Sequence, residues 1–144
     1  MKHAHTAIVL LALTVLACAT ALQADPIPPK LRDPSLQYFV ENHGADQHGI
    51  DRMIARELGS RGLAAKSGLA SARPAELDVL VVYEDRWQWD MSNYLIFLRI
   101  DFRDPETNIL LATGTSFQTS AARKPEAAVV TDIIAGMFAP SRPP

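Results

Sequence analysis

One segment of the sequence gathers the residue types that dominate molecular recognition. Residues 83–94 read Tyr-Glu-Asp-Arg-Trp-Gln-Trp-Asp-Met-Ser-Asn-Tyr and contain both tryptophans and two of the three tyrosines of the chain. Aromatic rings and arginine are enriched in binding hot spots, where they fill well-packed, desolvated pockets. We therefore predict a recognition surface for a protein or a glycan, formed by Tyr83, Arg86, Trp87, Trp89, Asp90 and Tyr94.

The orientation of these side chains depends on the backbone. In an extended segment, Trp87 and Trp89 share one face, whereas Arg86, Gln88 and Asp90 share the other. The alternative to a recognition surface is aromatic packing beneath a turn, with the nearby acids solvated or paired with Arg86. The sequence leaves both interpretations open.

Catalytic and metal-binding chemistry has weaker support. Glu84, Asp85 and Asp90 lack the regular spacing and the glycine of a calcium loop. His43 and His48 are five positions apart, a poor spacing for a shared zinc. No nucleophile, phosphate-loop or zinc-protease motif occurs in the chain, so we predict no cofactor, no metal and no enzymatic activity. A hydrolase would require a histidine within hydrogen-bond reach of Asp85 or Asp90.

Residues 1–24 have the order of a secretory signal peptide. Lys2 precedes an apolar run over residues 7–17, and small residues follow the run. The run is shorter than the roughly 20 apolar residues that a bilayer span needs. Residues 15–18 (Val-Leu-Ala-Cys) resemble a bacterial lipobox, in which the cysteine is lipidated and becomes the first residue. Ordinary cleavage after Ala21 or Ala24 is the alternative.

Two observations favour lipidation of Cys18. It is the only cysteine of the chain, and it stands at the end of the apolar run. A free thiol would be a liability in an oxidising compartment. We expect a signal peptide over residues 1–17, a lipidated, flexible, proline-rich tether over 18–34, one domain over 35–139 and a disordered tail over 140–144.

The composition limits the classes of partner. The chain has 144 residues, with 14 basic and 16 acidic side chains and a formal charge of −2. This near-neutral balance argues against a nucleic-acid-binding protein, which usually carries a basic excess. The length suits one small domain.

The hydrophobic pattern predicts an α+β domain. Strands are predicted at 35–40, 77–83, 94–103 and 109–119, helices at 46–61 and 125–138, and a turn at 104–108. Residues 64–74 are small and polar, which predicts a loop. The expected fold is a two-layer sandwich in which two helices cover one face of a mainly antiparallel sheet of about four strands, in the order β-α-β-β-β-α.

Single residues add detail to this prediction. Asp46 suits the start of the first helix, and Gly62 suits a left-handed residue beyond its end. Residues 77–83 are almost continuously apolar, which predicts a central strand covered on both faces. Gly114 predicts a bulge or a close approach within its strand.

Several phrases of the sequence resemble a group of known proteins. The helix ending in Arg-Glu-Leu-Gly-Ser-Arg-Gly-Leu (residues 56–63) and the strand Pro-Ala-Glu-Leu-Asp-Val-Leu-Val-Val-Tyr (residues 74–83) are similar to small bacterial envelope lipoproteins of unknown function. The layout also resembles the amino-terminal domain of TolB and the core of the curli secretion protein CsgG. These are small α+β modules that bind partners, and no catalytic residues come with the resemblance.

These observations lead to three hypotheses about function. The first is a non-enzymatic binding or assembly module, anchored to the membrane by its N-terminal lipid and binding an envelope protein or peptidoglycan. By the bacterial sorting rule, Ala19 after the cysteine implies the periplasmic face of the outer membrane; without lipidation the protein would be periplasmic. The second hypothesis is a soluble carrier of a small ligand, and the third is a small hydrolase.

Overall fold

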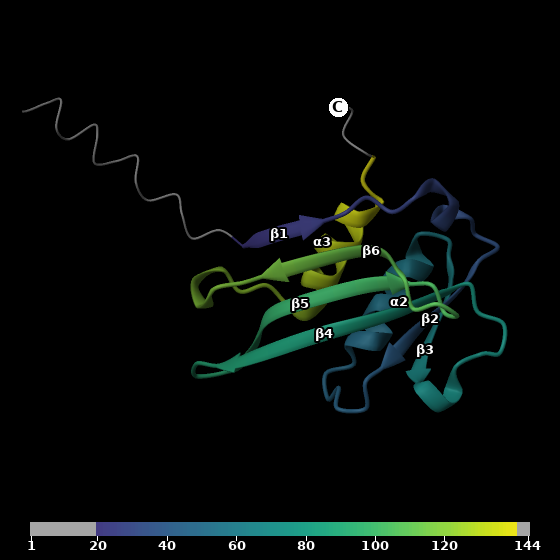
Figure 1. Cartoon of the computed structure of the whole chain (residues 1–144). Helices are drawn as coiled ribbons and strands as arrows, with labels where there is room; N and C mark the ends of the chain where they lie inside the picture. Colours follow the sequence, from purple (N-terminus) through teal and green to yellow (C-terminus); the bar gives the residue numbers. More distant parts are fainter. Residues whose placement is uncertain (1–19, 141–144) are drawn as a thin grey trace, which may run out of the picture.

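Six strands form one sheet, and two α-helices lie behind it (Figure 1). This computed structural model describes residues 20–140, so Cys18, the predicted signal peptide and the last four residues lie outside the described part. The strand order is β1-β6-β5-β4-β2-β3. The strands are β1 (Ala21–Ala24), β2 (Gln37–Asn42), β3 (Ala64–Leu69), β4 (Val79–Trp89), β5 (Asn93–Arg103) and β6 (Leu110–Phe117), and the helices are α2 (Ile50–Ser60) and α3 (Glu126–Phe138).

Helix α2 forms where the apolar spacing predicts it. Ile50, Ile54 and Leu58 recur every four residues and are completely buried, as one face of an α-helix requires. The helix ends at a left-handed Gly62 (φ 83°), and the Leu63 N–H bonds back to the Leu58 carbonyl at 3.3 Å. Glycine is favoured here because a side chain would strain the left-handed backbone.

Strand β4 is central, as its continuous apolar sequence predicts. It pairs antiparallel with β5 and parallel with β2, and Val79 and Val81 are completely buried. The predicted turn between β5 and β6 is also confirmed. Asn108 adopts a positive φ of 60°, and the Asp104 carboxylate accepts hydrogen bonds from the Glu106 and Thr107 N–H groups at 3.0 and 2.8 Å.

The α+β class is confirmed, but the predicted number of about four strands is wrong. The additional strands are β1 and β3, and β3 occupies most of the segment that the small, polar residues 64–74 predicted to be a loop. Strand β3 lies parallel to β2, with α2 as the crossover between them. Its sequence, Ala-Ala-Lys-Ser-Gly-Leu, has little strand propensity of its own, so pairing with β2 determines its conformation.

The expected tether over residues 18–34 is corrected from Ala21 onward. Residues 21–24 are strand β1, which pairs antiparallel with β6, and residues 29–32 form a short 3-10 helix. Ile27 and Leu31 are buried in the core, and the Ile27 N–H donates to the Met137 carbonyl at 2.8 Å. Prolines are compatible with this irregular but ordered path, because few of its backbone groups need a ladder partner.

Small residues let α3 lie directly on the β1–β6 edge of the sheet. A Cβ atom on Gly114 would lie 2.6 Å from Cγ2 of Ile133 and 3.0 Å from Sδ of Met137. A Cβ on Gly136 of the helix would lie 2.9 Å from Cβ of Ala24. Gly114 therefore marks a close approach rather than a bulge, and this contact ties β1, β6 and α3 together.

We expect Gly114→Ala to destabilise the protein by about 1–3 kcal/mol, because the added methyl group overpacks the contact with α3. Gly59→Ala is the matched control. Gly59 is a helical residue with open space around its Cα, so alanine there is expected to stabilise the protein by up to about 1 kcal/mol. Urea unfolding of both variants measures the difference, and effects of the same sign would contradict this account of Gly114.

Candidate functional site

The β4–β5 hairpin carries the predicted recognition residues, and a β-bulge decides which way they face. The pairing of the two strands shifts between Arg86 and Trp87, because Ile96 is an extra residue on β5. The Ile96 carbonyl instead accepts the Gln118 N–H at 2.8 Å. A bulge reverses the facing of every residue beyond it.

In a strand without a bulge, Tyr94, Ile96 and Leu98 would all lie on one face, and the extra residue changes this arrangement. Leu95 pairs with Trp87 and joins the core with an exposure of 2%. Tyr94 pairs with Gln88 instead, on the opposite face of the hairpin, and is buried under the Arg123 guanidinium, 4.2 Å from the ring centroid. The aromatic side chains of the segment 83–94 are therefore divided between the two faces of the hairpin and do not form one surface.

On the helix side of the hairpin, Asp85 organises a small polar cluster. Its carboxylate accepts a hydrogen bond from Nε1 of Trp87 at 2.6 Å, and it lies 2.7 Å from Nε2 of His43. The ring of His48 stacks on Trp87 with centroids 3.6 Å apart. The loop that carries both histidines, between β2 and α2, therefore packs against the hairpin.

The tautomer of His43 follows from its two partners. The Ala45 N–H donates to Nδ1 at 3.3 Å, so Nδ1 is the acceptor and neutral His43 carries its proton on Nε2, which donates to Asp85. The distance of 2.7 Å between His43 and Asp85 therefore meets the requirement stated above for a hydrolase, a histidine within hydrogen-bond reach of Asp85. In this tautomer the only basic lone pair of the ring is on Nδ1, and it accepts the Ala45 N–H, so both ring nitrogens have partners within the fold.

Asp46 and Tyr83 form a second pair beside this cluster. The Tyr83 hydroxyl donates to Asp46 at 2.8 Å. Burial, this hydrogen bond and the nearby carboxylates raise the pKa of Tyr83 well above its usual value. Burial alone would raise the pKa of Asp46, but the Tyr83 hydroxyl and three backbone N–H groups outweigh it and hold that pKa below its usual value. Those N–H groups belong to His48, Gly49 and Asp51.

Asp46 therefore organises the start of α2 from outside the helix. The sequence predicts it as the cap of a helix that begins at 46, but the helix begins at Ile50, after a left-handed Gly49. The difference arises because residues 46–49 form a turn around the Asp46 carboxylate before the helical hydrogen bonds start. Asp51, in the first turn, keeps one buried carboxylate oxygen without a hydrogen-bond partner within residues 20–140.

The end of the hairpin is a separate, exposed feature. We call residues 89–93 (Trp-Asp-Met-Ser-Asn) the hairpin tip. Trp89 is 71% and Met91 92% exposed, and Met91 has a positive φ of 58°. Arg123 holds the tip from the loop after β6, through an ion pair with Asp90 at 2.8 Å and a hydrogen bond to Ser92 at 3.0 Å.

The structure thus separates the six predicted recognition residues. Trp87 belongs to the polar cluster, and Tyr83 belongs to the pair with Asp46 beside it. Tyr94 and Asp90 both contact Arg123, and Trp89 is exposed at the tip. Arg86 is exposed, pairs with Glu84 at 2.6 Å and lies 4.9 Å from the Phe97 ring centroid. Sequence reasoning missed Asp46, Arg123 and Gln118 as partners, because each lies more than 20 positions from the hairpin residues that it contacts and gives no signal at short range.

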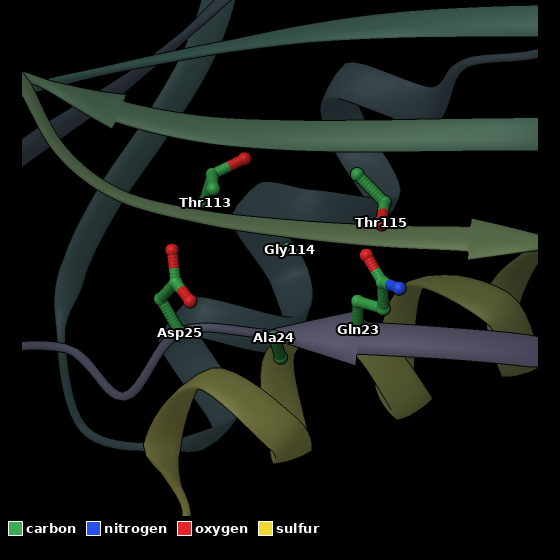
Figure 2. A pocket seen from close by; sticks show the side chains of 6 residues that line it. All are labelled: Gln23, Ala24, Asp25, Thr113, Gly114 and Thr115. Carbon is green, nitrogen blue, oxygen red and sulfur yellow. The ribbon is translucent and has the colours of Figure 1, made fainter.

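Three hollows in the described surface are small. One lies over β1 and β6 with a volume of about 120 Å³, where Figure 2 shows Gln23, Asp25, Thr113 and Thr115 pointing to the same side and Ala24 pointing toward α3. Another, of about 150 Å³, lies between α2 and α3. A third, of about 250 Å³, lies near Leu31, Leu36 and Leu111. Pockets for small ligands usually measure about 300–1,000 Å³.

Two further properties of residues 20–140 bear on the site. No group of three or more histidine, cysteine or acidic side chains is arranged to hold a metal ion within this range. None of the helices in the same range is long and apolar enough to cross a membrane.

Comparison with known proteins identifies the fold but not a family. The chain matches no protein-family model and no curated protein sequence. Among solved structures, it is similar to a dodecamer of a PelC variant from Paraburkholderia phytofirmans (TM-score 0.63, 11% identity, covering 85% of this chain and 100% of that one). A second PelC dodecamer from the same organism matches with a TM-score of 0.58 and 14% identity, covering 83% of this chain and 95% of the other. At these identities the likeness establishes a shared fold, and it leaves the resemblance to envelope lipoproteins a prediction.

We expect Asp46→Ala to destabilise the protein by about 1–2 kcal/mol at pH 7, because it removes the acceptor for several N–H groups at the start of α2. The Asp46 pKa is lowered in the folded state, so its contribution is present above the usual value of 3.8 and is lost as the pH falls through the lowered value. Urea unfolding at pH 7 and at decreasing pH should show the difference from wild type shrinking with acidification.

Gln47→Ala provides the control, since Gln47 is exposed in the same turn and its replacement should change stability by no more than about 0.5 kcal/mol. A loss of stability in Asp46→Ala that stayed constant at every pH would contradict the role of the carboxylate.

Proposed function

We propose that this protein is an exported, lipid-anchored envelope protein that acts as a non-enzymatic binding and assembly module. The predicted export signal of residues 1–17 and the single cysteine at position 18 support the anchor. The engagement of both His43 nitrogens within the fold supports a non-enzymatic role. The small volumes of the hollows favour a module that binds through its surface over a carrier that encloses a small ligand.

The observation that carries the lipid anchor is the position of β1. Its four residues pair with β6, from Ala21 opposite Phe117 to Ala24 opposite Gly114. Cleavage after Ala24 would remove the whole strand and uncover the edge of β6, and cleavage after Ala21 would remove its first residue. Processing before Cys18 leaves the strand intact, so this architecture favours a mature chain that begins at the cysteine.

The intact mass of the protein from a membrane fraction tests the anchor. We expect a chain that begins at Cys18 and carries acyl groups, and we expect Cys18→Ala to be unacylated and absent from the membrane fraction. Ala21→Leu is a matched control, because it removes the small residue of one of the two ordinary cleavage sites and leaves the lipobox unchanged, so the acylated chain should still begin at Cys18. An unacylated wild-type chain that begins at Leu22 or Asp25 would overturn the anchor.

We further propose that the partner in assembly is another copy of the same chain. The sheet has two unlike edges, the four-residue β1 and the six-residue β3. Exposed strand edges are templates for pairing, and contact between two unlike edges is head-to-tail, which generates rings or filaments. The PelC structures that share the fold are described as dodecamers, which supports testing self-association first.

Light scattering coupled to size-exclusion chromatography tests this assembly with the lipidated chain in detergent. We expect a protein mass several times that of one chain, which is 15.8 kDa with its signal peptide, and we expect the mass to decrease on dilution. A single-chain mass at all concentrations would exclude self-assembly. A different envelope protein or peptidoglycan would then be the partner to seek by pull-down.

A further inference from the structure

Large apolar side chains are exposed mainly at one end of the sheet. Seven such side chains are exposed within residues 20–140. Four of them gather at the end where β1 begins and the β4–β5 hairpin turns: Leu22 and Phe117 are each 45% exposed, Trp89 71% and Met91 92%. We call this set the apolar end. Exposed apolar groups that cluster in this way usually mark an interaction surface.

Strand register places the hairpin tip beyond the start of β1. Ala21 pairs with Phe117, Phe117 with Phe97, and Phe97 with Arg86, so these residues lie in one row across the sheet. From Arg86, strand β4 continues for three residues to Trp89 in the direction that leads away from the core. At about 3.3 Å per residue, Trp89 lies roughly 10 Å beyond the row that contains Ala21. Figure 1 shows the start of β1 and the turn of the hairpin at the same side of the molecule.

The short connection to Cys18 sets how far the domain can stand from an anchor. Ala21 is the third residue after Cys18, so the chain between them spans at most about 10 Å. This maximum length is about the same as the distance by which Trp89 lies beyond the row that contains Ala21. Because β1 is fixed in the sheet, a lipid on Cys18 would hold the apolar end, and not another surface of the domain, against the membrane.

The charges at the tip are compatible with a lipid surface. Asp90 is the only acidic residue of the tip, and Arg123 neutralises it through the 2.8 Å ion pair. Arg86, farther along the same strand, is paired with Glu84 at 2.6 Å, so this pair also carries no net charge. Tryptophan favours the membrane–water interface because its ring is apolar while its N–H remains hydrated.

We infer that the hairpin tip lies in the interfacial layer of the membrane that holds the lipid anchor, with Trp89 and Met91 inserted among the headgroups. This inference rests on the proposed anchor and adds the orientation of the domain. The free sheet edges and the face without helices then run away from the membrane plane, where they are accessible to partners.

Fluorescence quenching by brominated lipids tests the inference, because Trp87 and Trp89 are the only tryptophans of the chain. The lipidated full chain is reconstituted into vesicles of phosphatidylethanolamine and phosphatidylglycerol whose acyl chains carry bromine. In Trp87→Phe, which leaves Trp89 as the only tryptophan, we expect the brominated vesicles to remove most of the emission seen in unbrominated vesicles of the same composition. If Trp87→Phe does not fold, the difference between wild type and Trp89→Phe gives the same signal.

The control places a tryptophan at the opposite end of the sheet. Ile109 is 61% exposed in the turn between β5 and β6, so Ile109→Trp, made together with Trp87→Phe and Trp89→Phe, should remain unquenched in the same vesicles. Quenching of Trp89 alone supports the orientation. Equal quenching at both ends, or at neither, in a chain that is acylated and bound to the vesicles overturns the orientation and leaves the anchor intact. An unacylated intact mass overturns the anchor and this inference together.

Discussion

The close contact between α3 and the β1–β6 edge is the constraint on which the rest of the structure depends. Gly114 and Gly136 lack the side chains that would hold helix and sheet apart. Because the two surfaces meet, Ile133 and Met137 can fill the core above β6, and Ala24 can pack against the helix. Without this approach, β1 would have a ladder partner but no covering layer, and a four-residue strand is too short to remain ordered by pairing alone.

The second level of organisation is the loop between β2 and α2, which links the helical layer to the hairpin. Its aspartate, Asp46, gathers the N–H groups at the start of α2 and accepts the Tyr83 hydroxyl from β4. Its histidines then contact Asp85 and Trp87 farther along the same strand. Hydrogen bonds to a partly buried carboxylate are stronger than those between neutral groups, so this loop fixes the root of the hairpin while the tip remains exposed.

The sequence predicts those elements whose hydrophobic period is strong. Helices α2 and α3, the central strand β4 and the turn before β6 follow from the spacing of Ile54, Leu58 and Ile133 and from the turn chemistry of Asn108. Strands β1 and β3 were not predicted, because alanine, glycine and polar residues become strand there only through pairing with a neighbour. The ordered segment around Ile27 was missed for a similar reason. Its prolines suggest a flexible tether, but the burial of Ile27 in the core orders it.

The site was predicted less completely, because its geometry depends on contacts between distant parts of the chain. The sequence identifies the hairpin residues but cannot show the bulge at Ile96, whose carbonyl accepts the N–H of Gln118 from another segment. That one extra residue places Tyr94 on the opposite face of the hairpin from Trp87. In a hairpin without the bulge, the two rings would lie on the same face. The pairing of His43 with Asp85 joins positions 42 residues apart and leaves no signal at short range.

The pairing of β1 with β6 also has a consequence for the order of folding. Hairpins such as β4–β5 close early because their partners are neighbours in the chain, whereas closing a long loop carries a larger entropic cost. Strand β1 is the first element of the described chain, and its partner β6 is the last strand. Because closing this loop carries the largest entropic cost among the strand pairings, we expect an interval in which the other strands have paired and β1 has not. The edge of β6 stays uncovered during that interval, when a second chain could take the place that β1 will occupy.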